Sequence, residues 1–210
     1  KLADEMFPQM NVSHTEIMKN LSGKCLPWWT YPDRDTRHLM ENDGWWKSCE
    51  DEFINMYIAS GFEKHQAEKM APLIRPYVVD ITKHRLHDDA ITVLSSLKER
   101  GYRNYILSNN FPELTQMISH MGLDKYFEGC VVSARVGFAK PRKEIFEYAR
   151  NLADNPQRCI MIGDNPIDDI KGAKDCGFDT ILVNNRHPEY NGDYCDYICK
   201  TLTDMLDVLK

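Results

Sequence analysis

The sequence contains, at residues 161–170, the segment Met161-Ile162-Gly163-Asp164-Asn165-Pro166-Ile167-Asp168-Asp169-Ile170. The apolar run that leads into it, Cys159 to Ile162, predicts a short buried strand. The residues that follow, Ile167 to Cys176, predict a helix that ends at Gly177. A strand that passes directly into a helix is the building unit of an α/β fold with a parallel sheet.

The same alternation continues on both sides of this segment. Predicted strands lie at residues 105–107, 130–132, 159–162 and 180–183, with a short edge strand at 197–199, and predicted helices include residues 143–152. Short apolar strands that alternate with helices indicate a parallel sheet covered on both faces. We therefore predict an α/β fold with a doubly wound parallel sheet, which binds ligands beyond the carboxyl ends of its strands.

The first part of the chain has a different pattern. Phe53, Met56 and Tyr57 repeat with helical spacing, and strand-like runs are almost absent before residue 85. The prolines and apolar residues of 72–79 suggest a linker that leaves this helical unit. We predict a smaller, all-helical domain over residues 1–84 and an α/β core over residues 85–210.

Composition and charge exclude several classes of protein. The net charge of −6, without a basic run, argues against a nucleic-acid partner. No apolar stretch approaches the ~18 residues of a membrane span, so we predict no membrane partner. The seven cysteines are scattered and odd in number, which favours a reduced, cytoplasmic protein.

Polar side chains follow two of the predicted strands where ligands are expected. Ser108 and Asn109 end the strand at 105–107, and their hydroxyl and amide could donate to a phosphate oxygen or simply form a turn. Lys140 precedes Pro141, so its backbone is extended or turning before the next helix. Its ammonium group could bind an anion or stay solvated.

The segment at 161–170 carries the strongest chemical signal. Asp164, Asp168 and Asp169 place three carboxylates within six residues at a strand end. Carboxylate oxygens are the ligands that Mg²⁺ prefers, usually one or two together with waters and phosphate. The alternative is that these aspartates only favour the positive end of the following helix.

These elements, in this order, resemble the haloacid dehalogenase-like hydrolase superfamily. Ser108 matches the family's second motif, and Lys140 in Gly137-Phe138-Ala139-Lys140-Pro141 matches the third. Gly163-Asp164 with Asp168 or Asp169 matches the fourth, and residues 171–183 continue the family's usual run after it. The resemblance implies that the helical residues 1–84 are the cap of this family.

The resemblance also implies a function. It implies Mg²⁺-dependent hydrolysis of a small phosphorylated metabolite through an aspartyl-phosphate. Asp164 and Asp169, with Asp168 as the alternative to Asp169, would form the metal site. Lys140 would neutralise charge on the phosphoryl group, and Ser108 with Asn109 would hydrogen-bond it. The substrate and the oligomeric state stay open.

The family's first motif, Asp-x-Asp-x-Thr/Val at the end of the central strand, has no clear match here. The nearest candidate, Asp33-Arg34-Asp35-Thr36, follows Pro32 instead of an apolar strand and has Arg37 in the Thr or Val position. We expect the first strand and its nucleophile to precede Lys1. The alternatives are a relative that binds a phosphorylated ligand or a partner without catalysis, and a carbon–halogen hydrolase. The three aspartates favour a phosphatase over the latter.

Overall fold

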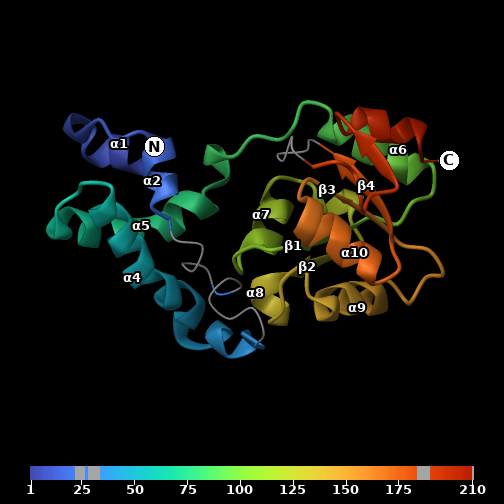
Figure 1. Ribbon diagram of the computed structural model, residues 1–210, viewed down its shortest axis with the longest axis horizontal. Helices are drawn as coiled ribbons and strands as arrows, with labels where there is room; N and C mark the ends of the chain where they lie inside the picture. Colours follow the sequence, from blue (N-terminus) through green and yellow to red (C-terminus); the bar gives the residue numbers. More distant parts are fainter. Residues whose placement is uncertain (22–26, 28–33, 184–189, 210) are drawn as a thin grey trace.

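The computed structural model describes residues 1–21, 27, 34–183 and 190–209. Figure 1 shows two regions side by side along the long axis. The helical region contains α1 (Leu2–Met6), η1 (Pro8–Met10), α2 (His14–Lys19), η2 (Arg37–Asp43), α4 (Gly44–Ala59), α5 (Lys64–Val79) and η3 (Ile81–Lys83). The rest of the chain forms the α/β region. The predicted boundary near residue 84 stays a prediction.

The helical region is held together by α4 and α5. The helical face predicted from Phe53, Met56 and Tyr57 is confirmed, because all three side chains are buried. The two helices share an apolar cluster, which includes Met56 of α4 and Met70 of α5. No helix in the described ranges is both long enough and apolar enough to cross a membrane.

The linker predicted over residues 72–79 is wrong. These residues form the second half of α5, which continues through Pro72 and Pro76 to Val79. Each proline removes one helical hydrogen bond and opposes the helix at that point. Burial of Ala67, Met70 and Ala71 against neighbouring elements favours the helix despite this local cost.

The α/β region alternates strands and helices, as predicted. Its strands are β1 (Tyr105–Ser108), β2 (Gly129–Val132), β3 (Ile160–Gly163), β4 (Asp179–Val183) and β5 (Tyr197–Cys199). Its helices are α6 (Ala90–Glu99), α7 (Leu114–His120), η4 (Asp124–Tyr126), α8 (Ser133–Val136), α9 (Lys143–Leu152), η5 (Pro166–Lys171), α10 (Gly172–Asp175) and η6 (Thr203–Asp207). Every observed strand pair is parallel, which confirms the predicted α/β class.

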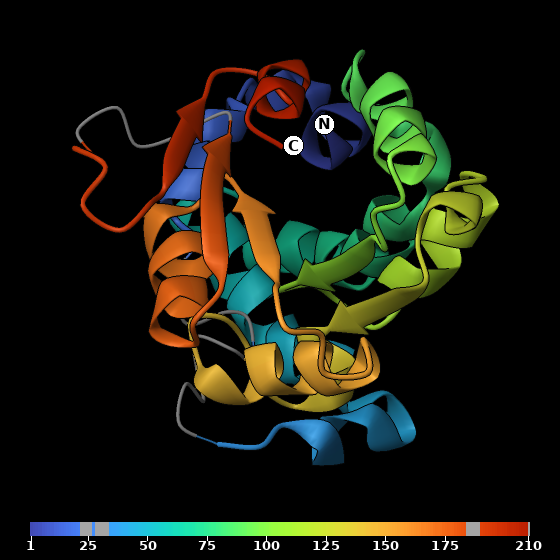
Figure 2. The ribbon, with the colours of Figure 1, turned by 90° about the vertical axis from the view of Figure 1, so that its right-hand side faces the viewer.

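The strands are distributed over two sheets. β1 pairs with β2, and β3, β4 and β5 form a second sheet in that order. Figure 2 shows them as separate groups of arrows, yellow-green for the first and orange to red for the second. Within the described residues, β1 and β3 share no ladder. Their carboxyl ends nevertheless carry the predicted site residues of the second and fourth motifs.

Helices cover both faces of the sheet that contains β3. Ile160 and Ile162 contact the apolar cluster of α6, β4 and η6. Met161, between them, belongs to the cluster of α9 and α10. Since successive strand residues point to opposite faces, α6 lies on one side of this sheet and α9 on the other. The doubly wound arrangement is therefore confirmed for this sheet.

Phe146 of α9 gives a test of this packing. Its side chain is fully buried, and its ring meets that of Phe178 edge to face at 5.8 Å. We expect Phe146→Ala to lower the free energy of unfolding by about 3–5 kcal/mol, because it leaves a cavity. Urea unfolding measures the change. Tyr148→Ala, on the exposed side of the same helix, should cost less than about 1 kcal/mol. Equal losses would contradict this account of the core.

Candidate active site

The predicted site residues lie at the carboxyl ends of β1 and β3. Ser108 is the last residue of β1, and Gly163 is the last residue of β3. Lys140 stands on the loop between α8 and α9 and contacts residues from both places. The structure therefore brings together residues that the sequence separates into three motifs.

The centre of the site is an ion pair between Lys140 and Asp169. The ammonium nitrogen Nζ of Lys140 lies 2.5 Å from Oδ1 of Asp169. The two side chains are only 9% and 7% exposed, respectively. Nζ also donates to the carbonyl oxygen of Leu107, at 2.9 Å. The lysine is thus held at the end of β1 by one charged and one neutral acceptor.

Asn109 fixes the main chain of Lys140. Its Nδ2 donates to the carbonyl oxygen of Lys140 at 2.9 Å, and its Oδ1 accepts from the Lys140 amide at 2.7 Å. These two hydrogen bonds resemble those between neighbouring strands, and they join the end of β1 to the loop that contains Lys140. The phosphate-binding role of Asn109 stays a prediction, and the observed contacts are those of a positioning residue.

Ser108 is linked to the site through its neighbours. Nδ2 of Asn110 lies 3.5 Å from the hydroxyl oxygen of Ser108. The amide of Asn110 donates to the hydroxyl of Ser133, at the start of α8, at 3.0 Å. These contacts tie the turn after β1 to the end of β2, and the phosphate-binding role of Ser108 stays a prediction.

Asp169 also organises the loop that follows β3. Its Oδ2 accepts from the amides of Asp164 and Asn165, each at 3.0 Å. A Cβ atom at Gly163 would lie 2.3 Å from this Oδ2 and 2.5 Å from the Asp169 Cβ. Only glycine can occupy position 163 while Asp169 reaches back to the loop and to Lys140.

The helix predicted over Ile167 to Cys176 is confirmed as the continuous helical segment of η5 and α10, but the π-helical form of η5 was not predicted. η5 is a π-helix, and the amide of Ile170 donates to the carbonyl of Asn165, five residues earlier. The side chain of Asn165 caps this turn by accepting from the amides of Ile167 and Asp168, both at 2.9 Å. The widened turn coincides with the return of the Asp169 carboxylate to the loop after β3. π-turns of this kind occur frequently at functional sites.

Asp168 has a different environment from its neighbour. Its side chain is half-buried, and its Oδ2 accepts from Nδ2 of Asn165 at 3.2 Å. Burial raises the pKa of Asp168, the charge of Asp169 raises it further, and the charge of Lys140 opposes both. A nearby cation would relieve this unfavourable burial of negative charge.

The acidic residues also bear on metal binding. Among the described residues, no group of three or more His, Cys, Asp or Glu side chains is placed to hold a metal ion. Mg²⁺ does not need such a group, because it commonly binds one or two carboxylates and completes its shell with waters. Both oxygens of Asp169 already accept hydrogen bonds. Asp168 lines the cavity and accepts one hydrogen bond at Oδ2, from Asn165, so its carboxylate fits Mg²⁺ better than that of Asp169 does. The place of Asp164 in the metal site stays a prediction.

A cavity of about 180 Å³ lies beside the ion pair, between the two regions of the molecule. Its walls include Lys140, Asp168 and Ser133 from the α/β region and Arg34, Thr36 and Trp45 from the helical region. Trp45 is 2% exposed and packs in the cluster of Cys49 and Phe53, and it also borders the cavity.

The helical region closes one side of this cavity with residues 34–37. The amide and hydroxyl of Thr36 both donate to the carbonyl of Gly137, at 3.0 and 3.3 Å. Gly137 has φ +84°, and a Cβ there would lie 2.1 Å from Oδ1 of Asp35. Asp35 accepts from the amide and Nε of Arg37, which lowers its pKa. Asp35 is thus engaged in loop structure, while Asp33 lies outside the described residues.

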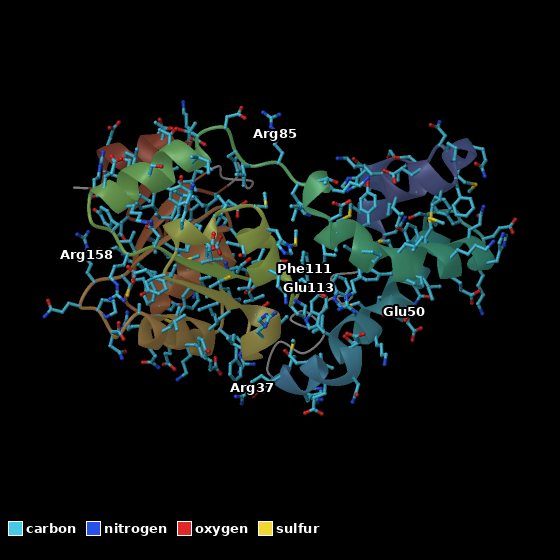
Figure 3. All side chains as sticks on the ribbon, turned by 180° about the vertical axis from the view of Figure 1, so that it is seen from behind. Arg37, Glu50, Arg85, Phe111, Glu113 and Arg158 are labelled. Atoms are coloured by element: carbon cyan, nitrogen blue, oxygen red, sulfur yellow. The ribbon has the colours of Figure 1, made fainter. Side chains whose placement is uncertain are left out.

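A second contact between the regions involves Glu113, which precedes α7. Its Oε1 accepts from Nε1 of Trp46 at 3.0 Å and from Nε of Arg75 at 2.9 Å. The ring of Trp46 also packs against Phe111 at 5.6 Å. Figure 3 shows Phe111 and Glu113 where the helical and α/β regions meet. The sequence pattern did not predict this contact, because its residues are separated along the chain by up to 67 positions.

Sequence comparisons relate the chain to known proteins. A model of the haloacid dehalogenase-like hydrolase family matches residues 4–177. A glyceraldehyde 3-phosphate phosphatase of Methanothermobacter thermautotrophicus is 32% identical over 67% of this chain and 58% of its own length. A pyrimidine 5′-nucleotidase of Escherichia coli is 37% identical over 48% of this chain and 45% of its own.

A solved structure extends the likeness to the whole fold. A hydrolase of Bacillus subtilis superposes with a TM-score of 0.72 at 22% identity, over 100% of this chain and 88% of its own. By sequence, the chain spans about half the length of the curated relatives above.

The ion pair between Lys140 and Asp169 gives a test of the site's energetics. We expect Asp169→Asn to lower the free energy of unfolding by about 3–5 kcal/mol, because it leaves a buried ammonium without its carboxylate. The amide's NH₂ would also face the backbone donors of Asp164 and Asn165. Chemical denaturation of the two proteins measures the difference.

The exposed pair between Lys171 and Asp175 provides the control. These side chains are 40% and 62% exposed, so water screens their attraction. Asp175→Asn should therefore cost several-fold less than Asp169→Asn. A double-mutant cycle with Lys140→Met should show strong coupling to Asp169→Asn. Additive effects would show that the pair does not stabilise the site.

Proposed function

The chain belongs to the haloacid dehalogenase-like hydrolase family, and we propose that it is a Mg²⁺-dependent phosphatase of small phosphate monoesters. The observation that carries the proposal is the buried Lys140, held by Asp169 at the edge of a cavity. Phosphoryl transfer depends mainly on positioning and on neutralising charge. A fixed ammonium group beside a cavity supplies both.

The names of the relatives support phosphate esters as the substrate class. They include a glyceraldehyde 3-phosphate phosphatase, a pyrimidine 5′-nucleotidase and, at 27% identity, a phosphoserine phosphatase of Thermus thermophilus. The alcohol parts of these substrates differ, but each name specifies a phosphate ester. We therefore propose the shared reaction for this chain.

Each residue of the site has a defined task in this proposal. Lys140 donates to an oxygen of the phosphoryl group and offsets the charge that develops there. Asp169 keeps the ammonium in place, and Asn109 holds the lysine main chain. The Ser108 hydroxyl supplies a further donor from the end of β1. The helical region acts as the cap that separates the reacting groups from water.

Mg²⁺ would be held by the Asp164 carboxylate, with Asp168 as its acidic neighbour. When bound, the ion offsets negative charge on the phosphoryl oxygens. The family resemblance implies Asp169 as the second acidic residue of the metal site, but the oxygens of Asp169 accept from Lys140 and from two backbone amides. We propose that Asp169 positions Lys140 and the loop, and that Asp168 faces the metal.

The aspartyl-phosphate that the family resemblance implies requires a further carboxylate facing Lys140. We assign this role to none of the described residues, because the carboxylates on the 164–169 loop already have other tasks. In this proposal the described residues bind the phosphoryl group and neutralise its charge.

Removal of the Lys140 charge tests the proposal. We expect Lys140→Met to lower kcat/KM for p-nitrophenyl phosphate by about 10²–10³-fold, the usual effect of removing a transition-state donor. Release of p-nitrophenol in the presence of Mg²⁺ measures it. Lys171→Met removes an exposed lysine on η5 and should leave kcat/KM within about twofold of that of the unmodified protein. Full activity in Lys140→Met would refute the role of the lysine.

Removal of the metal gives a separate test. We expect a chelator to abolish phosphate release and added Mg²⁺ to restore it. Without the cation, the carboxylate of Asp164 would repel the negatively charged phosphoryl group. Asp164→Asn should raise the half-saturating Mg²⁺ concentration by at least about tenfold, since it replaces a charged ligand.

The two alternative functions predict other outcomes in these assays. A carbon–halogen hydrolase would release chloride from 2-chloropropionate with or without Mg²⁺. A relative that only binds phosphorylated ligands would take up inorganic phosphate, detected by calorimetry, and show no turnover. Chloride release without phosphate release would overturn the phosphatase proposal.

A further inference from the structure

Three cationic residues and one acidic residue line the cavity between the two regions. The cationic residues are Lys140, Arg142 and Arg34, and the acidic residue is Asp168. Lys140 is paired with Asp169, and Arg142 is paired with Glu144 at 2.5 Å. Within the described ranges, the guanidinium of Arg34 has no acidic partner.

The main chain of Arg34 is fixed to the α/β region. Its carbonyl oxygen accepts from Nη1 of Arg142 at 3.2 Å. Two residues later, Thr36 donates twice to the carbonyl of Gly137. Arg34 is therefore presented to the cavity from the helical region, while Lys140 lines it from the α/β region. A substrate in this cavity would meet cations from both regions.

The size of the cavity favours a short substrate. Its volume of about 180 Å³ is close to the ~150 Å³ of an engineered cavity that takes benzene. A phosphoryl group near Lys140 leaves space for a short carbon skeleton, whose far end would lie toward Arg34. A carboxylate at that end matches the planar fork of a guanidinium, which can form two parallel hydrogen bonds.

We propose that Arg34 selects phosphate monoesters of small hydroxy acids by binding their carboxylate. This inference rests on the proposed phosphatase function and adds to it the chemical class of the substrate. A neutral alcohol part, as in a simple sugar phosphate, would give the exposed guanidinium of Arg34 no charged group to bind. Arg34 is thus a specificity residue, and Lys140 serves the phosphoryl group of any monoester.

A matched pair of substrates tests the selection. 3-Phosphoglycerate has a carboxylate where glycerol 3-phosphate has a hydroxymethyl group. We expect kcat/KM of the unmodified protein to favour 3-phosphoglycerate by at least about tenfold, equivalent to one additional charge-assisted contact. Arg34→Met should reduce this ratio to within about threefold of one by lowering kcat/KM for the acid alone. Arg34→Lys should restore part of the preference, since it keeps the charge without the fork.

Two controls separate this inference from the proposed function. p-Nitrophenyl phosphate has no carboxylate, so Arg34→Met should hydrolyse it within about twofold of the unmodified protein. Arg85→Met removes a guanidinium that pairs locally with Asp88 and lies at the outer edge of the molecule in Figure 3. In Arg85→Met, the ratio of kcat/KM for 3-phosphoglycerate to kcat/KM for glycerol 3-phosphate should not change. An equal loss on all three substrates in Arg34→Met would assign the arginine to general phosphate binding and overturn its role in selection.

A binding experiment decides the inference even if no ester is hydrolysed. Phosphonoacetate and phosphonoacetamide have nearly the same shape, but only the first has a carboxylate. By calorimetry we expect phosphonoacetate to bind at least about tenfold more tightly, and Arg34→Met to remove the difference. Equal affinities in the unmodified protein would refute the selection of acids. If phosphonoacetate binds more tightly than phosphonoacetamide but no ester is hydrolysed, only the phosphatase function is refuted.

Discussion

The buried ion pair between Lys140 and Asp169 imposes most of the local structure of the site. Taking two opposite charges out of water costs roughly several kcal/mol for each ion, and the cost is offset only when their remaining hydrogen-bonding capacity is also satisfied. Here the second oxygen of Asp169 accepts two backbone amides, and Lys140 donates to the Leu107 carbonyl. The wide first turn of η5 accommodates this geometry, and glycine at position 163 is required by it.

The same constraint connects the site to the helical region. Lys140 stands three residues after Gly137, whose carbonyl accepts both hydrogen bonds from Thr36. A short loop thus carries the lysine at one end and the docking point of residues 34–37 at the other. Glu113 makes a second connection, because it binds Trp46 of α4 and Arg75 of α5. Displacement of the helical region would therefore act directly on the loop that presents the ammonium group.

Local patterns in the sequence were sufficient for the fold class. α9 and β5 have the predicted bounds, and Lys140 and Asp169, which were named from separate motifs, form an ion pair, while their roles in the site stay predictions. The errors arose where distant contacts outweigh local preference. α5 passes through two prolines because its apolar face is buried, and the docking of Thr36 on Gly137 joins residues 101 positions apart. Patterns within one segment contain no information about such contacts.

The ambiguity between Asp168 and Asp169 shows how geometry separates residues that sequence treats alike. Neighbouring residues of a helix point in different directions, and the described contacts pair Lys140 with Asp169. Asp169 points back to the lysine and the loop amides, whereas Asp168 lines the cavity. One aspartate therefore neutralises the lysine, and the other leaves a negative charge on the cavity wall. That charge opposes a phosphate dianion unless a cation lies between them, so the phosphatase proposal and the magnesium proposal depend on each other.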